Sequence, residues 1–228
     1  MISVKELVKE SRLTGNYFAP DAYLQGDLES GLIENRGGGR LLALPESFLR
    51  AIYEGLEEEV GAAAEPVLYK CGAWWGKTFY RRFAEEVSKS LGRPMADIDM
   101  IEFLQSFKQC WKTHGWGNIE LDFDFYQHGF IVAQISNSAF AKSSPTLDKP
   151  KCFVEAGLLS SFFTGLTGQK LHCIQTTCES MGADCNYFVL GLPERVKRAE
   201  AWLQEKHDHA TIMERLCQSQ MDRYLNLE

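Results

Sequence analysis

The chain has 228 residues, of which 45% are apolar and 24% are charged, and its formal net charge is −7. This length suits one sizeable domain, or one domain with an extension. The acidic balance argues against a protein that binds nucleic acid by neutralising its phosphates, and we expect no nucleic-acid partner.

No run of residues approaches the ~18 apolar residues that a membrane span needs, so we expect no transmembrane segment. The apolar residues of 1–12 are separated by Lys and Glu, unlike the core of a signal peptide. We therefore expect a cytoplasmic protein, or one that is peripheral to a membrane. In that compartment the seven cysteines are free, packed or metal-bound more often than paired in disulfides.

Short strand signals and long helical ones alternate in the first half of the chain. Residues 2–13 predict an amphipathic helix, and a linker follows to residue 19. Strands are predicted over 31–36 and 40–44, and the three glycines between them indicate a hairpin turn, because the Lys-Ser/Thr ending of a phosphate-binding loop is missing. Apolar residues at helical spacing then predict helices over 45–60, 66–91 and 97–113. Gly72 and Gly76, inside the second helix, would let another segment approach its backbone closely.

The apolar period changes after residue 116. Strict alternation predicts strands over 117–125 and 130–135, and a polar loop follows to residue 150. A buried helix over 156–167 precedes a hairpin of strands over 171–177 and 186–190. A charged amphipathic helix from 193 to 225, broken near 207–209, completes the chain. Hairpin strands with segregated helices predict an α+β fold with helices packed on an antiparallel sheet.

Four of the seven cysteines lie between residues 152 and 191: Cys152, Cys173, Cys178 and Cys185. Thiolates suit zinc, and a structural zinc site has four ligands. None of the spacings is the common Cys-x2-Cys pair, so structural zinc, packed free thiols and redox chemistry all remain open. His172 neighbours Cys173 and points to the opposite strand face, which favours a surface or edge histidine over a ligand.

Aromatic residues are frequent, and some of them are candidates for the lining of an apolar ligand pocket. The candidates are Trp74, Trp75, Phe107, Trp111, His114, Trp116 and Phe123. The alternative is that these rings form ordinary core. His114 is either the polar group of such a pocket or a histidine placed at a helix C-terminus by the macrodipole.

Catalytic motifs are missing from the sequence. There is no Gly-x-Ser-x-Gly elbow, His-Glu-x-x-His pair or dinucleotide fingerprint. Glu155 and Glu179 are acids suited to proton transfer, but nothing pairs them with a nucleophile.

The stretch Cys152-Phe-Val-Glu-Ala-Gly, the small-residue helix after it, and Cys178-Glu-Ser-Met-Gly-Ala-Asp-Cys185 resemble the vinyl-4-reductase domain family. The resemblance covers residues 20–192 and is specific over 152–191. The family includes a bacteriochlorophyll-biosynthesis protein, sensor domains of bacterial activators for phenol and xylene, and stand-alone cyanobacterial proteins linked to photosystem assembly, which this chain resembles most. The resemblance implies the α+β ligand-binding fold of TRAPP-complex subunits and haem nitric-oxide sensors. Residues 1–19 are then an N-terminal helix and linker, and 193–228 a helical extension.

The resemblance also implies a zinc site. Its aromatic-sensing members hold zinc with a Cys before the helix, a Glu on the first hairpin strand and two Cys around the turn, which match Cys152, Gln175, Cys178 and Cys185. Glutamine is a poor zinc ligand, so Cys173, two residues earlier on the same strand face, is the expected replacement.

The function that the resemblance implies is non-enzymatic binding of a hydrophobic small molecule. The expected ligand is a tetrapyrrole, either a chlorophyll precursor or a bilin, handled during photosystem assembly by a homodimer with photosystem assembly proteins as partners, in the cytoplasm or at the thylakoid surface. One alternative is a tetrapyrrole vinyl reductase that needs an external reductant, because the sequence has no flavin, nicotinamide or iron–sulfur signature. Another is a dimeric assembly scaffold.

Overall fold

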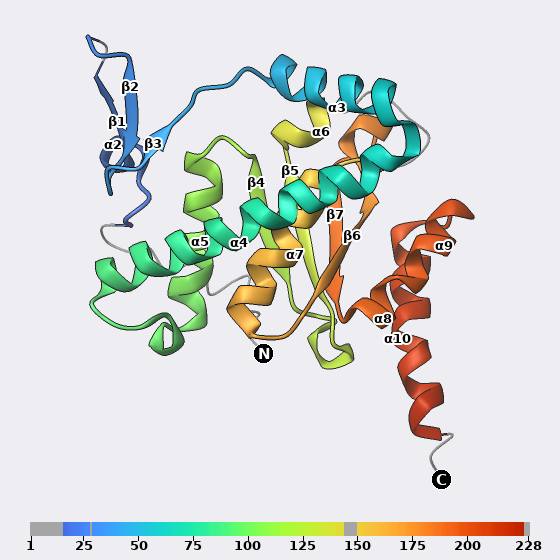
Figure 1. Cartoon of the computed structure of the whole chain (residues 1–228). Coiled ribbons are helices and arrows are strands. Elements are labelled where there is room, and N and C mark those ends of the chain that lie inside the picture. The colour runs from blue at the N-terminus through green and yellow to red at the C-terminus, as the bar shows by residue number, and fades with distance from the viewer. Residues whose placement is uncertain (1–15, 28, 144–149, 226–228) are drawn as a thin grey trace.

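The computed structural model describes residues 16–27, 29–143 and 150–225, and the helix predicted over 2–13 lies outside them. A four-stranded antiparallel sheet with strand order β4-β5-β7-β6 forms the centre of the fold (Figure 1). Strands β4 and β6 are therefore its two edges. The bounds are β4 Asn118–Asp122, β5 Ile131–Ser136, β6 His172–Thr177 and β7 Asn186–Gly191.

Alternation along the strands sends neighbouring side chains into two separate cores. Phe188 and Leu190 of β7 enter the larger core, whereas Val189 between them enters the smaller one. The register places Val132 of β5 opposite Val189. Both faces of the sheet are thus covered.

Three long helices form the larger core with one face of the sheet: α4 Ala64–Leu91, α5 Met100–Thr113 and α7 Phe153–Thr167. Helix α5 begins with a capping box, in which the Asp99 side chain accepts from the Glu102 amide and the Glu102 side chain from the Asp99 amide. Helix α7 ends at Gly168, whose φ of 69° is the left-handed conformation that glycine adopts without strain.

Glycines bring helices α4 and α7 into backbone contact (Figure 1). A Cβ added at Gly72 would lie 2.0 Å from the carbonyl oxygen of Val154, and one added at Gly157 would lie 2.0 Å from that of Tyr69. Gly76 has the same relation to Leu158, at 2.3 Å. The expected close approach to Gly72 and Gly76 is confirmed, and the approaching segment is α7.

The C-terminal extension covers the second face of the sheet. Its helices are α8 Pro193–Val196, α9 Arg198–Gln204 and α10 His209–Leu225. Val196, Ile212 and Leu216 are buried against β5, β6 and β7. The predicted break near 207–209 is confirmed: Lys206 has a φ of 62°, and the Asp208 side chain accepts from the Thr211 amide at 2.8 Å.

A small second sheet lies away from the central one (Figure 1). It consists of β1 Leu24–Asp27, β2 Leu32–Asn35 and β3 Arg40–Leu41, after the short helix α2 Pro20–Tyr23; β1 was not predicted. The Gly37 and Gly39 amides donate to the Asn35 side chain at 3.0 and 2.7 Å. These two amides are therefore engaged within the turn, and the three glycines form the predicted hairpin turn.

Helix α3, Glu46–Val60, follows the small sheet in the chain and precedes α4, and it packs against α6, Ala139–Ser143 (Figure 1). Helix α6 falls inside the segment predicted as a polar loop, so that prediction was wrong for these five residues. The α+β fold class is confirmed. Among the described residues, no helix is both long enough and apolar enough to cross a membrane.

Candidate functional site

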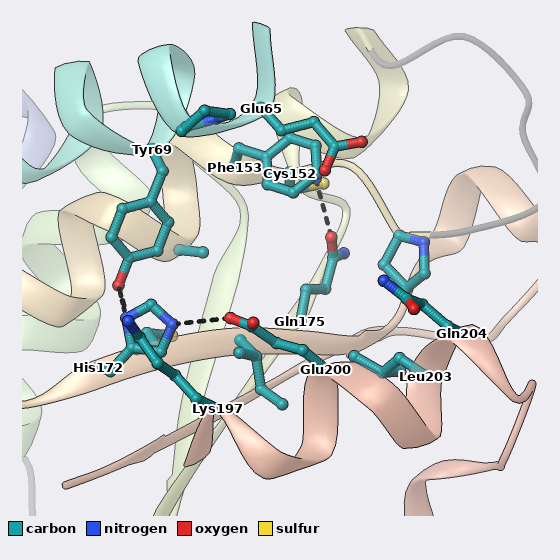
Figure 2. A pocket seen from close by; sticks show the side chains of 15 residues that line it. Glu65, Tyr69, Cys152, Phe153, His172, Gln175, Lys197, Glu200, Leu203 and Gln204 are labelled. Carbon is teal, nitrogen blue, oxygen red and sulfur yellow. Dashed lines mark hydrogen bonds and ion pairs between the residues drawn. The ribbon is translucent and has the colours of Figure 1, made fainter. Parts of the chain in front are cut away.

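A pocket of about 420 Å³ lies at the β6 edge of the central sheet, between α4, the start of α7, and α9 (Figure 2). Its volume is within the ~300–1,000 Å³ that is typical of small-molecule sites. The lining residues are Glu65, Pro66, Tyr69, Pro150, Cys152, Phe153, Ala156, His172, Cys173, Ile174, Gln175, Lys197, Glu200, Leu203 and Gln204. Helix α9 supplies one wall, so the C-terminal extension is part of the pocket.

A chain of hydrogen bonds joins α4 to α9 around the sheet edge. The Tyr69 hydroxyl lies 2.8 Å from His172 Nδ1, and His172 Nε2 lies 3.2 Å from Glu200 Oε1 (Figure 2). The Cys173 amide donates to the Tyr69 oxygen at 3.2 Å. Because the Glu200 carboxylate can only accept, His172 Nε2 carries the hydrogen and donates to it, and Nδ1 of the neutral ring accepts from the Tyr69 hydroxyl.

Burial keeps the two inner members of this chain neutral. It raises the pKa of Tyr69 far above the physiological range. It also lowers the pKa of His172, against the hydrogen bond and charge of Glu200, which raise it. The pocket therefore presents a neutral phenol and a neutral imidazole to a ligand.

The thiols of Cys152 and Cys178 form a buried pair beside the pocket. Their sulfurs are 3.8 Å apart. The hydrogen bond from Cys152 lowers the pKa of Cys178 to about 6, and the same bond, with burial, raises the pKa of Cys152. The Gln175 side chain fixes the start of α7, since its oxygen accepts from the Cys152 amide at 2.9 Å.

The other two predicted zinc ligands do not join this pair. Cys173 is five residues before Cys178, a distance of roughly 15 Å along a strand. Cys185 instead forms a hydrogen bond with Tyr187, and this bond raises the pKa of Tyr187. The Tyr187 ring packs against the smaller core, on the other face of the sheet. Two sulfurs 3.8 Å apart suit a tetrahedral zinc with ~2.3 Å bonds. However, no group of three or more His, Cys, Asp or Glu residues in the described chain is arranged to hold a metal. The zinc site stays a prediction that elemental analysis tests, and Gln175, whose amide is engaged on both sides, does not complete it.

The two acids that sequence analysis considered as bases have different surroundings. Glu179 accepts from the amides of Asn137 and Ser138 at 2.7 and 3.0 Å and from Asn186, so it fixes the hairpin to the chain after β5. Glu155 is fully buried, and burial raises its pKa well above the ordinary value. One of its oxygens accepts from the Ser138 hydroxyl at 3.0 Å, and its other oxygen has no partner in the described chain.

None of the seven residues predicted to line an aromatic pocket lines this one. Most of them pack into the larger core instead. Phe107 lies 4.8 Å from Phe162 between ring centroids, and Trp111 lies 5.1 Å from Trp116. Phe123 is partly buried against the same core, as Trp116 is. Trp75 contacts Trp116 at 4.9 Å between ring centroids, and Trp74 is 65% exposed.

His114 caps the C-terminal end of α5, as one of its two interpretations predicted. Its Nδ1–H donates to the Cys110 carbonyl at 2.8 Å, and its Nε2 accepts from Arg82 at 3.3 Å. Burial lowers the pKa of His114 to about 4. The imidazole is therefore neutral, and the hydrogen bonds hold it rather than the charge of the helix end.

Comparison with known proteins identifies part of this architecture. A sequence model of the V4R domain matches residues 131–192, the segment that runs from β5 through β7. The phenol-responsive sensory domain of the transcription activator PoxR, solved with phenol, matches with a TM-score of 0.62 at 15% identity, over 85% of this chain and 98% of that chain. This likeness shows the fold.

Two further structures match at lower TM-scores. A vinyl-4-reductase family protein from Methanocaldococcus jannaschii gives 0.44 at 17% identity, over 66% of this chain and 82% of that chain. A trafficking protein particle complex subunit 3 from Naegleria fowleri, covalently bound to palmitic acid, gives 0.46 at 15% identity, over 64% and 94%. No curated protein matches this chain. The V4R match over residues 131–192 confirms the predicted family resemblance in that segment, and its cyanobacterial photosystem detail stays a prediction.

Proposed function

We propose that this protein binds a small, mostly apolar molecule in the pocket at the β6 edge. The observation that carries the proposal is a hollow of about 420 Å³ whose apolar walls enclose a fixed set of hydrogen-bonding groups. Small-molecule sites combine these two features.

The lining suggests how such a ligand is oriented. Pro66, Phe153 and Leu203 offer apolar contact. At the polar end both nitrogens of His172 are engaged, and the Tyr69 oxygen can accept one more hydrogen bond. Lys197 is exposed at the same wall and makes no ion pair within the described residues. A ligand hydroxyl group would donate to the Tyr69 oxygen, and a ligand carboxylate would pair with Lys197. The PoxR domain of similar fold, solved with phenol, supports a ligand of this kind.

A finer form of the proposal names the ligand as a tetrapyrrole, a chlorophyll precursor or a bilin, handled during photosystem assembly. It rests on the family resemblance. The homodimer and the photosystem assembly partners belong to the same finer proposal.

The test is a binding panel of phenol, a chlorophyll precursor and a bilin, followed by tryptophan fluorescence and by two-dimensional NMR. We expect saturable binding by at least one compound, with shifts at the pocket residues. Leu203→Trp fills the pocket from α9 and should abolish this binding. Arg198→Trp places the same ring on the same helix at an exposed position outside the pocket, and should leave binding intact.

Two outcomes would overturn the proposal. One is that no compound saturates. The other is that Leu203→Trp and Arg198→Trp bind equally well, which would place the ligand elsewhere. Binding of phenol without either tetrapyrrole would remove only the finer form.

A further inference from the structure

Strand β6 is an edge strand, and in the described part of the chain no strand lies beside its outer backbone groups. Unpaired edge groups are normally covered by side chains or by another chain. The partners of these groups in β6 can be followed one residue at a time.

The first outward groups are covered by side chains from α7 and α4. The Leu171 amide donates to the Thr164 hydroxyl at 3.0 Å, and the Leu171 carbonyl accepts from the Ser160 hydroxyl at 2.8 Å. The Cys173 amide then donates to Tyr69 at 3.2 Å. Outward groups therefore belong to the odd-numbered residues, as the two-residue period of a strand requires.

The covering stops at the pocket. By the same period the Cys173 carbonyl and the Gln175 amide also point outward, because the bulge in β6 comes only after Gln175. Neither group has a hydrogen-bond partner within the described residues. Cys173, Ile174 and Gln175 all line the pocket. Consecutive side chains of a strand point to opposite faces of the sheet. A pocket that is lined by three consecutive residues therefore faces the backbone edge of the strand as well as its side chains.

From this arrangement we infer that the pocket recognises a planar amide-type group, a lactam or a primary carboxamide. The ligand N–H donates to the Cys173 carbonyl, and the ligand carbonyl accepts from the Gln175 amide. Free backbone groups two residues apart on one edge present one acceptor and one donor side by side, which matches the donor and acceptor of an amide. The inference rests on the proposed function and adds the chemical class of the ligand.

A matched pair of bicyclic probes, 2-quinolone and N-methyl-2-quinolone, tests this inference. The two share the ring and the carbonyl, and methylation removes only the donor. We expect 2-quinolone to bind at least about tenfold more tightly by titration calorimetry, because the methylated probe leaves the Cys173 carbonyl buried without a donor.

Amide hydrogen exchange of the full chain provides the second readout. The Gln175 amide should exchange fast in the free protein and slow at least about tenfold with 2-quinolone bound. The Ile174 amide points toward β7 and serves as the internal control, protected with and without the probe.

Equal affinities for the two probes, or a Gln175 amide that is already protected in the free protein, would overturn the inference. In either case, pocket binding of a phenol or pigment that Leu203→Trp abolishes would leave the proposed function standing. If neither the probes nor the ligand panel binds, both fail together.

Discussion

Helices α4 and α7 contribute to two regions of the molecule, an aromatic cluster that they form with α5 and the pocket at the β6 edge. The cluster is filled with side chains, whereas the pocket is hollow. In the cluster, ring meets ring: Phe162 lies 4.8 Å from Phe107 and 5.3 Å from Phe79 between centroids. At the pocket, the sheet ends, and α4 and α9 come from opposite faces to meet around its edge. Richness in Trp and Phe therefore marks the core of this protein, whereas the cavity lies where three elements meet at a free strand edge.

Replacing a ring of the cluster should have the largest effect. Phe162 is fully buried, so Phe162→Ala should lower the free energy of unfolding by ~3–5 kcal/mol through lost burial and a new cavity. Leu203→Ala at the pocket removes contacts that already face a cavity and should cost only about 1 kcal/mol. Urea denaturation measures both. Equal losses would show that the pocket is packed as tightly as the cluster.

The glycine contact between α4 and α7 positions both regions. Gly157→Ala would place its Cβ 2.0 Å from the Tyr69 carbonyl oxygen, so the helices must separate. We expect a loss of about 3 kcal/mol in the same denaturation experiment. Gly55→Ala in α3 is the control, because its Cβ would meet no atom of the described residues within 4 Å, and it should stabilise by ~0.5–1 kcal/mol. A neutral Gly157→Ala would contradict the close backbone contact.

The neutral His114 of the cluster should make stability depend on pH. Burial lowers the pKa of His114 to about 4 in the folded protein, below the ordinary histidine value of 6.5. As the pH falls, His114 is therefore protonated in the unfolded chain before it is protonated in the folded protein. The contribution of neutral His114 to the free energy of unfolding is complete above pH 6.5 and is lost as the pH falls toward 4. At pH 5 this amounts to about 2 kcal/mol relative to pH 8.

The control for this prediction is His114→Gln, which keeps a donor near the Cys110 carbonyl and removes the titration. The difference in unfolding free energy between the unmodified protein and His114→Gln should become smaller from pH 8 to pH 5. Parallel pH curves would show that His114 is not held neutral by burial.

The smallest expected effect tests the hydrogen-bonded wall of the pocket. Tyr69→Phe leaves the Cys173 amide and His172 Nδ1 without a partner, which should cost ~1–2 kcal/mol. Tyr80→Phe is the matched control on the same helix: its ring packs on Phe162 and no hydrogen bond involves its hydroxyl in the described chain, so the change should be close to neutral. If both variants unfold alike, the Tyr69 hydroxyl does not hold α4 to the sheet edge.

Part of the site was visible in the sequence. The family resemblance implied that Cys152 and Cys178 share one site, and their sulfurs are 3.8 Å apart. The replacement of Gln175 by Cys173 as a zinc ligand relied on their sharing a strand face. A shared face does not make two residues equally distant from a third, and Cys173 lies too far along the strand from Cys178.

The sequence by itself determined the long helices, the two hairpins of the central sheet and the α+β class, because the apolar period of each segment depends only on its own residues. It also placed the glycines of α4 where a second helix could approach. The tertiary structure alone decided which rings fill the core and which residues form the pocket. Tyr69 and His172 are 103 positions apart, and Glu200 comes from the C-terminal extension. Periodicity shows which face of an element is buried, but the partner that covers that face is chosen by packing against distant segments. The pocket exists where that packing leaves the edge of β6 uncovered.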